Sequence, residues 1–513
     1  MQNEIATYIG QKGYTIKKEN ISIEEQQLIR KELNVKPYVP KSSLIKPQPF
    51  PVYRESQKKL YVPRFYGLET YGDPDTIILS EGKDIDLKFN GGLRPAQKPI
   101  VDKFMKHISN KGCGLLALHT GFGKTCIGLY ILSLLKKKTL IVVHKEFLLR
   151  QWIERIEQFL PDARVGKIQG KTIDVVDKDI VICMLQSISM KDYPKGLFEE
   201  FGFSIFDEVH HISAEVFSRA LFKIVTKYSL GLSATMQRKD GLTKVIKWFL
   251  GDIVCKKERK GEDNVLVKAI TYSIDDEQFN KVEKDFRGNI KYTTMIKKIC
   301  EFNRRTEFIL QILKDTLNEN SAQQIMILAH QKKLLAYIHD AIKQRTIATV
   351  GYYVGGMKEK DLKISEGKKV IIATYAMAEE GLDIKSLTTL IMATPKVDVT
   401  QSIGRILRKK HDQALVIDIV DTHSLFQRHF KKRKTFYRKQ KFKVIATDFI
   451  GYNNNEWEIV YDPQKNIKKQ LKNKIDKKTG KKINKKIVIK TSKGIKEKKD
   501  KLLQGFCLIG DDY

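Results

Sequence analysis

A glycine-rich stretch that ends in lysine and threonine, residues 118–125, carries the residue types best suited to phosphate chemistry. An apolar run precedes it and another follows it, which predicts the order strand, loop, helix. Glycines let a backbone curl until its N–H groups face phosphate oxygens, and a helix start adds partial positive charge. Lys124 would reach the β- and γ-phosphates, and the Thr125 hydroxyl would bind Mg²⁺. The candidate nucleotide-binding residues here are Leu118, His119, Thr120, Gly121, Phe122, Gly123, Lys124 and Thr125.

This stretch departs from the full phosphate-loop pattern at one position. The pattern has a glycine five residues before Gly123, where this chain has Leu118. The remaining tail, Thr-Gly-Phe-Gly-Lys-Thr, is a less specific signal. The alternative interpretation is a glycine-rich turn whose lysine is solvated.

Two adjacent carboxylates, Asp207 and Glu208, follow a second apolar run. An enzyme that hydrolyses nucleotides needs such a pair. Asp207 would hold Mg²⁺, mostly through the water around the ion. Glu208 would polarise the attacking water as a general base. The alternative is a turn at a strand end with solvated acids, which becomes hard to sustain once the glycine-rich loop is taken into account.

Two further segments carry weaker signals. Residues 231–235 place small hydroxyl side chains at a strand end, where an ordinary turn is the simpler interpretation. Gln401 lies shortly before Arg405 and Arg408, which are three residues apart and share one face of a helix. Guanidinium groups stabilise the negative charge that accumulates during phosphoryl transfer. Without the other motifs, a surface helix with solvated arginines would be favoured.

Continuous apolar runs alternate with helix-length segments through most of the chain. This alternation predicts parallel sheets that helices cover on both faces, in two tandem α/β units. The expected strands of the first unit are 114–118, 139–144, 180–183, 203–207 and 228–233, with helices at 145–160 and 215–226. The expected strands of the second unit are 269–273, 324–328, 346–352, 370–373, 389–393 and 414–419.

Four parts follow from these patterns: an N-terminal accessory region, 1–88; a first α/β domain, 89–256; a second α/β domain, 257–447; and a lysine-rich tail, 448–513. The accessory region has a capped helix at 22–33 and short strands near 53–56 and 60–64. Arg54, Arg64 and the nearby tyrosines are candidate nucleic-acid contacts, although half-buried strand aromatics are the more frequent case. The tail is either an arm that binds nucleic acid or a solvated segment, and both interpretations stay open.

Composition narrows the class of protein. The 513-residue chain has a formal net charge of +34, which is typical of a protein that binds a polyanion, most often nucleic acid. The alternative causes of this charge are solubility or an A/T-biased genome, which favours lysine codons. Six scattered cysteines argue against a zinc site or a disulfide framework. No signal peptide and no membrane-spanning run is visible, so we expect an intracellular, soluble protein without a membrane partner, in the cytoplasm, the nucleus or a virion.

Together, the segments resemble the ordered motifs of superfamily 2 helicases over residues 89–447. Residues 92–97 resemble the segment that reads adenine, with Gln97 as the reader. The stretches 120–125, 143–152, 207–210 and 233–235 resemble motifs I, Ia, II and III. The stretch 325–338 resembles motif IV, Thr374 together with 380–384 resembles motif V, and 401–408 resembles motif VI. Because of the resemblance to motif V, Gly381 and Asp383 are also candidate nucleotide-binding residues. In this superfamily the loop is read from Thr120 onward, so Leu118 is a family trait.

Residues 233–242 are similar to the branch that contains XPB and UvsW. Residues 53–67 resemble members from large DNA viruses, including the poxvirus transcript-release helicase. The resemblance implies two RecA-like domains and an ATP- and Mg²⁺-dependent motor. Lys124, Asp207, Glu208, Gln401, Arg405 and Arg408 would be its catalytic residues, and Thr125 and Asp207 would hold the metal.

The resemblance also implies a substrate and partners. The motor would track 3′ to 5′ on DNA, with RNA or an RNA–DNA hybrid as further substrates, and motifs Ia, IV and V would contact the phosphate backbone. Viral relatives suggest a role in transcription and the transcription machinery as a partner. Two other functions stay open: a translocase that moves on duplex without separating strands, and a nucleic-acid-binding scaffold without catalysis.

Overall fold

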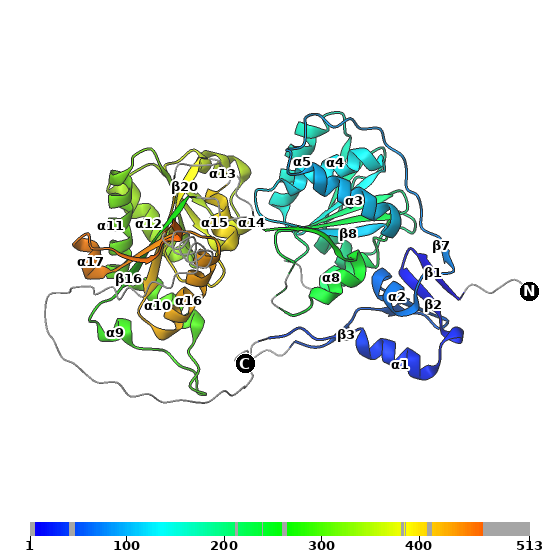
Figure 1. Ribbon diagram of the computed structural model, residues 1–513, viewed down its shortest axis with the longest axis horizontal. Helices are drawn as coiled ribbons and strands as arrows, with labels where there is room; N and C mark the ends of the chain where they lie inside the picture. The colour runs from blue at the N-terminus through cyan, green and yellow to red at the C-terminus, as the bar shows by residue number, and fades with distance from the viewer. Residues whose placement is uncertain are drawn as a thin grey trace, which may run out of the picture. The chain divides into compact units, whose positions relative to one another are not determined.

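The computed structural model describes residues 6–39, 47–210, 214–236, 238, 240–258, 264–380, 384, 386–407 and 413–464. Gly381, Asp383 and Arg408 lie outside the described residues, as does nearly all of the lysine-rich tail. The chain divides into two compact units, Met1–Asp462 and Pro463–Tyr513. The described residues of the first unit form three sheets of five or more strands (Figure 1).

The N-terminal region folds around a five-stranded sheet in the order β5-β6-β2-β1-β7. Its strands are β1 (Thr7–Gly10), β2 (Gly13–Lys17), β5 (Arg54–Glu55), β6 (Lys59–Val62) and β7 (Thr76–Ile77), and its helices are α1 (Ile23–Glu32) and α2 (Arg64–Tyr71). A separate pair, β3 (Asn34–Val35) and β4 (Phe50–Pro51), follows α1. The expected helix cap is present, because Ser22 Oγ accepts a hydrogen bond from the Glu25 backbone N–H at 3.1 Å.

The first lobe, residues 98–257, contains an eight-stranded sheet in the order β11-β10-β12-β9-β13-β14-β8-β15. All of its strands are parallel except β11. The strands are β8 (Cys113–Leu118), β9 (Thr139–Val143), β10 (Val165–Gln169), β11 (Thr172–Ile173), β12 (Ile180–Met184), β13 (Phe203–Asp207), β14 (Tyr228–Ser233) and β15 (Ile253–Lys257). The helices are α3 (Lys98–Lys111), α4 (Lys124–Leu135), α5 (Glu146–Phe159), α6 (Leu185–Met190), α7 (Ala214–Leu221) and α8 (Thr243–Leu250).

The second lobe, residues 265–461, repeats this architecture with the strand order β18-β19-β17-β20-β21-β16-β22-β23. Only β23 is antiparallel to its neighbour. The strands are β16 (Val265–Tyr272), β17 (Gln324–Ala329), β18 (Val350–Tyr353), β19 (Val370–Thr374), β20 (Leu387–Met392), β21 (Ala414–Asp421), β22 (Lys443–Asp448) and β23 (Glu458–Tyr461). The helices are α9 (Glu277–Asn280), α10 (Tyr292–Glu301), α11 (Asn303–Glu319), α12 (Lys332–Gln344), α13 (Glu359–Glu366), α14 (Tyr375–Glu380), α15 (Thr400–Ile406), α16 (Ser424–Lys439) and α17 (Phe449–Asn453).

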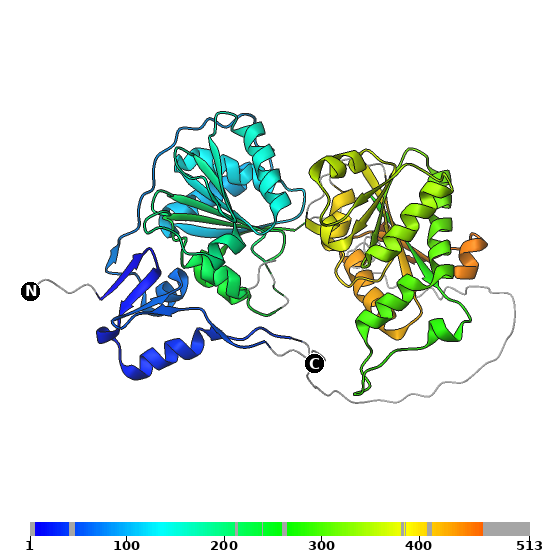
Figure 2. The ribbon, with the colours of Figure 1, turned by 180° about the vertical axis from the view of Figure 1, so that it is seen from behind.

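Both large sheets have an apolar core on each face. In β8, Leu115 and Ala117 belong to one cluster, whereas Leu116 and Leu118 belong to the other. Successive strand residues point to opposite faces, so a strand that is buried along its whole length reads as an unbroken apolar run. Helices cover both faces of each sheet (Figures 1 and 2). The predicted class, two tandem RecA-like parallel-sheet domains, is confirmed.

The predicted boundary at residue 448 is wrong. Strand β22 ends at Asp448, and β23 then pairs with β22 in the second-lobe sheet. Residues 448–461 therefore belong to the second lobe and not to a tail. The error has a physical cause: an edge strand that is half exposed lacks the long apolar run by which central strands are recognised.

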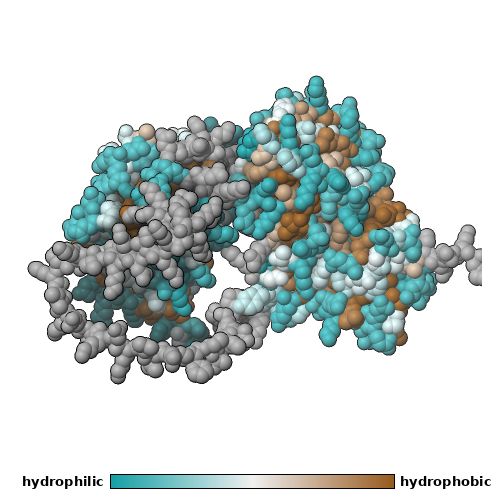
Figure 3. All heavy atoms as spheres, in the orientation of Figure 1, coloured by the Kyte–Doolittle hydropathy of each residue, from teal (hydrophilic) through white to brown (hydrophobic). Residues whose placement is uncertain are grey.

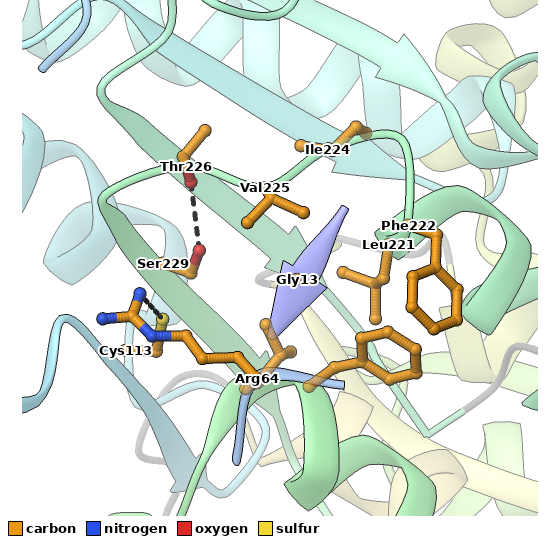
Figure 4. A pocket seen from close by; sticks show the side chains of 11 residues that line it. Gly13, Arg64, Cys113, Leu221, Phe222, Ile224, Val225, Thr226 and Ser229 are labelled. Atoms are coloured by element: carbon orange, nitrogen blue, oxygen red, sulfur yellow. Dashed lines mark hydrogen bonds between the residues drawn. The ribbon is translucent and has the colours of Figure 1, made fainter. Parts of the chain in front are cut away.

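Arg54 and Arg64 bind the N-terminal region to the first lobe. Arg64 donates to the Lys227 carbonyl at 3.2 Å and contacts Cys113 Sγ at 3.3 Å, beside a small cavity between the two parts (Figure 4). Arg54 donates to the Arg219 carbonyl at 3.2 Å. Both guanidinium groups are thus engaged with protein, so the expectation that they are candidate nucleic-acid contacts is not supported.

The surface of the described residues is mainly hydrophilic on the face shown in Figure 3, with scattered apolar patches. No helix in the described part of the chain is both long and apolar enough to cross a bilayer.

Candidate functional site

Three loops meet at the carboxyl edge of the first-lobe sheet. Strands β13, β14 and β8 are neighbours, and the loops that follow them begin at Glu208, Ala234 and His119. Because parallel strands all end at the same edge, segments far apart in sequence come together there. The structure therefore brings the glycine-rich loop next to the carboxylate pair, as a nucleotide site requires.

The glycine-rich loop has a backbone that only glycine adopts easily. Gly121 and Gly123 have φ values of +83° and +91°. A Cβ on Gly121 would meet no atom within 4 Å, so this side of the loop is open, whereas a Cβ on Gly123 would lie 2.5 Å from Gln97 Nε2. Helix α4 begins directly after Gly123, and its first residues are Lys124 and Thr125. The arrangement is a curled loop at a helix N-terminus, which binds anions.

Gln97 and Arg94 support this loop from one side. The Gln97 amide accepts from the Arg94 backbone N–H at 2.8 Å and donates to the Phe122 carbonyl at 2.9 Å. The Arg94 guanidinium also donates to Phe122 and Gly121 carbonyls. Sequence reasoning singled out Gln97 and overlooked Arg94, whose proximity to the loop depends on the fold. Leu118 is fully buried as the last residue of β8, so its side chain is part of the core and does not line the site.

Lys124 and Glu208 form a close ion pair. Their Nζ and Oε1 atoms are 2.5 Å apart, and the side chains are only 13% and 19% exposed. Glu208 also lies 3.4 Å from His210 Nδ1, which is 2.5 Å from Ser233 Oγ. The loop cation, the second carboxylate, His210 and the last residue of β14 thus share one small polar space. A cation and a general base can act on the same phosphate only if both side chains face the same space, as Lys124 and Glu208 do here.

Trp152, the last residue of the stretch that resembles motif Ia, holds the Asp207 carboxylate in position. The indole Nε1–H of Trp152 donates to Asp207 Oδ2 at 2.9 Å, and the Glu208 backbone N–H donates to Oδ1 at 2.9 Å. Burial, followed by the charge of Glu208, raises the pKa of Asp207, while Lys124 and Trp152 oppose that rise. Trp152 is itself 1% exposed, so it cannot contact a nucleic-acid strand. The sequence placed Trp152 in motif Ia, which was expected to contact the strand, and did not indicate its hydrogen bond to Asp207.

Asp207 and Thr125 offer the oxygen ligands that a Mg²⁺ ion with few protein ligands would need. In the described part of the chain, no three His, Cys, Asp or Glu side chains gather as a metal site. At nucleotide sites Mg²⁺ is generally held by one or two protein oxygens together with water and substrate phosphates. Each oxygen of Asp207 keeps a second lone pair beside its hydrogen bond. Thr125 lies in the first turn of α4, next to Lys124.

Replacing Trp152 by phenylalanine tests this anchor. The ring remains but the N–H that orients Asp207 is lost, and a hydrogen bond to a charged group contributes about 1.5–3 kcal/mol. We expect the kcat for ATP hydrolysis to fall about tenfold, with a smaller change in KM. Trp248→Phe is the matched control, since Trp248 is a first-lobe tryptophan that packs on Tyr66. Equal turnover in both variants would contradict a positioning role for Trp152.

Helix α15 of the second lobe carries Gln401 and Arg405. Gln401 Nε2 lies 3.4 Å from His210 Nε2, and Thr120 Cβ lies 3.3 Å from the position that a Cβ on Gly404 would occupy. Arg405 is 7% exposed in the same helix. The structure therefore brings two of the predicted segments together, the end of motif II and the start of motif VI.

Two buried Arg–Asp pairs hold the loop that leads into α15. Arg305 pairs with Asp421 at 2.5 Å and donates to the Ala393 carbonyl at 2.8 Å. Arg433 pairs with Asp418 at 2.8 Å and donates to the Lys396 carbonyl. Paired arginines that also satisfy backbone carbonyls fix a loop with little freedom. No sequence motif indicated these pairs, because their members are more than a dozen residues apart.

Comparison with known proteins identifies the family. Residues 90–238 match the family model "Type III restriction enzyme, res subunit", and residues 306–410 match "Helicase conserved C-terminal domain". A predicted ATP-dependent RNA helicase, L396 of Acanthamoeba polyphaga mimivirus, is 36% identical over 486 residues, which cover 92% of each chain. The chain belongs to the superfamily 2 helicases. It is an ATP-dependent nucleic-acid helicase of the XPB/UvsW type found in large DNA viruses.

More distant relatives of this helicase have similar names. A predicted ATP-dependent RNA helicase, QP509L of African swine fever virus (isolate Pig/Kenya/KEN-50/1950), is 27% identical over 72% of this chain and 77% of its own. The DNA 3′-5′ translocase XPB2 of Sulfurisphaera tokodaii is 29% identical over 67% of this chain and 84% of its own. A crystal structure of T4 UvsW is 20% identical, covers 83% of this chain and 96% of that one, and has a TM-score of 0.33, too low to support an argument.

Proposed function

We propose that this helicase moves 3′ to 5′ along a DNA strand and displaces the strand paired with it, including an RNA transcript, during viral transcription. Similarity to a protein named a DNA 3′-5′ translocase carries the choice of DNA and of direction. The viral relatives are named as RNA helicases. A motor that tracks on DNA and displaces RNA from a hybrid is compatible with both names.

Each residue of the ATP site has a role in this proposal. Lys124 binds the β- and γ-phosphates, and the open side of the loop at Gly121 leaves room for them. Glu208 accepts a proton from the attacking water as general base. Gln401 and Arg405 complete the site from the second lobe, with Arg405 as fixed positive charge. Gln97, which contacts the loop backbone, orients the adenine base of ATP.

A bound Mg²⁺ ion supplies positive charge that neutralises the phosphate oxygens. Asp207 and Thr125 would hold it. Trp152 and the Glu208 backbone N–H keep the Asp207 carboxylate in one orientation. His210 and Ser233 connect Glu208 to the residues after β14, so these side chains couple the ATP site to the strand that the helicase holds.

A strand-displacement assay tests direction and substrate together. The substrates are DNA duplexes and RNA–DNA hybrids that carry a single-stranded DNA or RNA tail at the 3′ or the 5′ end of the loading strand. We expect ATP-dependent displacement from 3′ DNA tails, with either DNA or RNA as the displaced strand. Displacement only from 5′ tails, or only from RNA tails, would overturn the proposal.

Duplex translocation without strand separation is the second candidate, because the name of the archaeal relative describes a translocase. Displacement of a third strand from a triplex measures movement along intact duplex. A helicase that displaces the triplex strand but leaves tailed duplexes paired would establish this second function.

A further inference from the structure

An aromatic row crosses the carboxyl edge of the second-lobe sheet. We define it as the rings of Tyr375, His330, Tyr292 and His429, which lie 4.8, 6.5 and 5.6 Å apart in that order, centroid to centroid. Tyr375 follows β19, and His330 follows β17. Tyr292 begins α10, and His429 belongs to α16. These two helices lie side by side in Figure 1.

The middle of this row is accessible. Tyr292 is 38% exposed and His330 is exposed, whereas Tyr375 is buried. A tyrosine that packs on one histidine at each side while leaving part of its ring in solvent is held in position but keeps a surface for a ligand. Only His330 lies within a segment that the sequence motifs covered. Tyr292 and His429 lie outside them.

The charged groups around the row are positive. Lys396 Nζ lies 4.7 Å from the Tyr375 ring centroid. On α16, Arg428, Lys431 and Lys432 are exposed, and within the described part of the chain they have no ion-pair partner. Lys432 is three residues after His429, so both lie on one face of the helix. Burial and the charges of Arg433, Lys432 and Arg428 lower the pKa of His429 to about 4, so its ring is neutral near pH 7.

Neutral aromatic rings beside unpaired cations suit single-stranded nucleic acid. Bases stack on aromatic side chains, and lysine or arginine side chains bind the phosphates between them. The same edge of open α/β sheets is where ligands generally bind. A protein partner with an acidic surface would match the cations but would not need the exposed ring between two histidines.

We propose that the second lobe holds a single strand by stacking a base on Tyr292, with Arg428 and Lys432 on neighbouring phosphates. This inference rests on the proposed function, because it assigns part of the strand path of the same motor. Motifs Ia, IV and V are expected to contact the nucleic-acid backbone. The inference adds a stacking contact to a base, which does not depend on the base sequence of the strand.

The test compares Tyr292→Ala, Tyr292→Phe and Tyr452→Ala in the full chain. Tyr452 is the matched control, because it is a half-buried second-lobe tyrosine on α17, outside the predicted motifs, whose hydroxyl donates to Asp315. The probes are a fluorescent oligo-dT and an abasic oligonucleotide of the same length, and the readouts are the Kd and strand-stimulated ATP hydrolysis. We expect Tyr292→Ala to weaken oligo-dT binding about tenfold, while Tyr292→Phe and Tyr452→Ala bind as the parent does.

The abasic strand separates stacking from a structural role. If Tyr292 stacks on a base, Tyr292→Ala and the parent bind the abasic strand equally. An equal loss on both strands, or no loss on oligo-dT, would overturn the inference. A parent protein whose ATP hydrolysis no strand stimulates would instead contradict the proposed function, so the two failures can be distinguished.

Removing the cations gives an independent readout. Arg428→Ala combined with Lys432→Ala should reduce the slope of log Kd against log salt by about 1.4, since each phosphate contact to a single strand contributes about 0.7. An unchanged slope would show that these two side chains do not contact phosphates and would overturn that part of the inference.

Discussion

Lys124→Ala should abolish ATP hydrolysis, with kcat reduced by at least about 1000-fold. The expected size reflects the removal of the one loop cation that faces the phosphates in a site shielded from water. The 2.5 Å pair with Glu208 adds to the effect, because the carboxylate would lose the positive charge that it faces. Phosphate release in the presence of a stimulating strand measures the change.

The matched control for this variant is Lys111→Ala. Lys111 is an exposed lysine at the end of α3 in the same lobe, away from the loops that form the site. It should leave turnover unchanged. A thermal melt of both variants shows whether the fold is kept. Retained turnover in a folded Lys124→Ala protein would contradict the assignment of the phosphate loop.

Glu208→Gln should preserve ATP binding and stop hydrolysis. Glutamine keeps the size and hydrogen bonding of glutamate but cannot accept a proton at neutral pH, and general base catalysis contributes 100- to 10,000-fold. The site keeps Lys124 and the loop N–H groups, so the Kd for ATP should change little. Single-turnover hydrolysis and binding of a fluorescent ATP analogue measure the two quantities separately.

Glu157→Gln is the control for the lost charge. Glu157 is an exposed carboxylate on α5 of the same lobe. If both glutamine variants hydrolyse ATP at the parent rate, Glu208 is not the base. If Glu208→Gln loses ATP binding as well, its main role is to position Lys124 and not to accept a proton.

Much of the fold was predictable because of how parallel sheets are buried. Strands covered on both faces read as unbroken apolar runs, and β13 and β14 begin and end where the sequence predicted them. Edges were less predictable. Strand β18 starts at Val350 instead of 346, and β23 extends the second-lobe sheet past 448, because half-exposed strands lack that signature.

The chemistry-bearing residues were predictable for a different reason. Phosphate binding and general base catalysis require particular residue types at fixed spacing within short stretches, so Lys124, Thr125, Asp207 and Glu208 stand out in the sequence alone. The structure places Lys124 against Glu208. Their catalytic roles, and those of Gln401 and Arg405, stay predictions that the variants above test.

The sequence by itself determined the two-lobed α/β class, the family and the segments that carry the ATP chemistry. Each of these is encoded in contiguous residues whose pattern follows from local burial or from the chemistry of one loop. Only the tertiary structure decided that Trp152 orients Asp207 and that Tyr292 lies between His330 and His429. Such contacts depend on strand order and helix packing, which bring distant residues together and leave no fixed spacing along the chain.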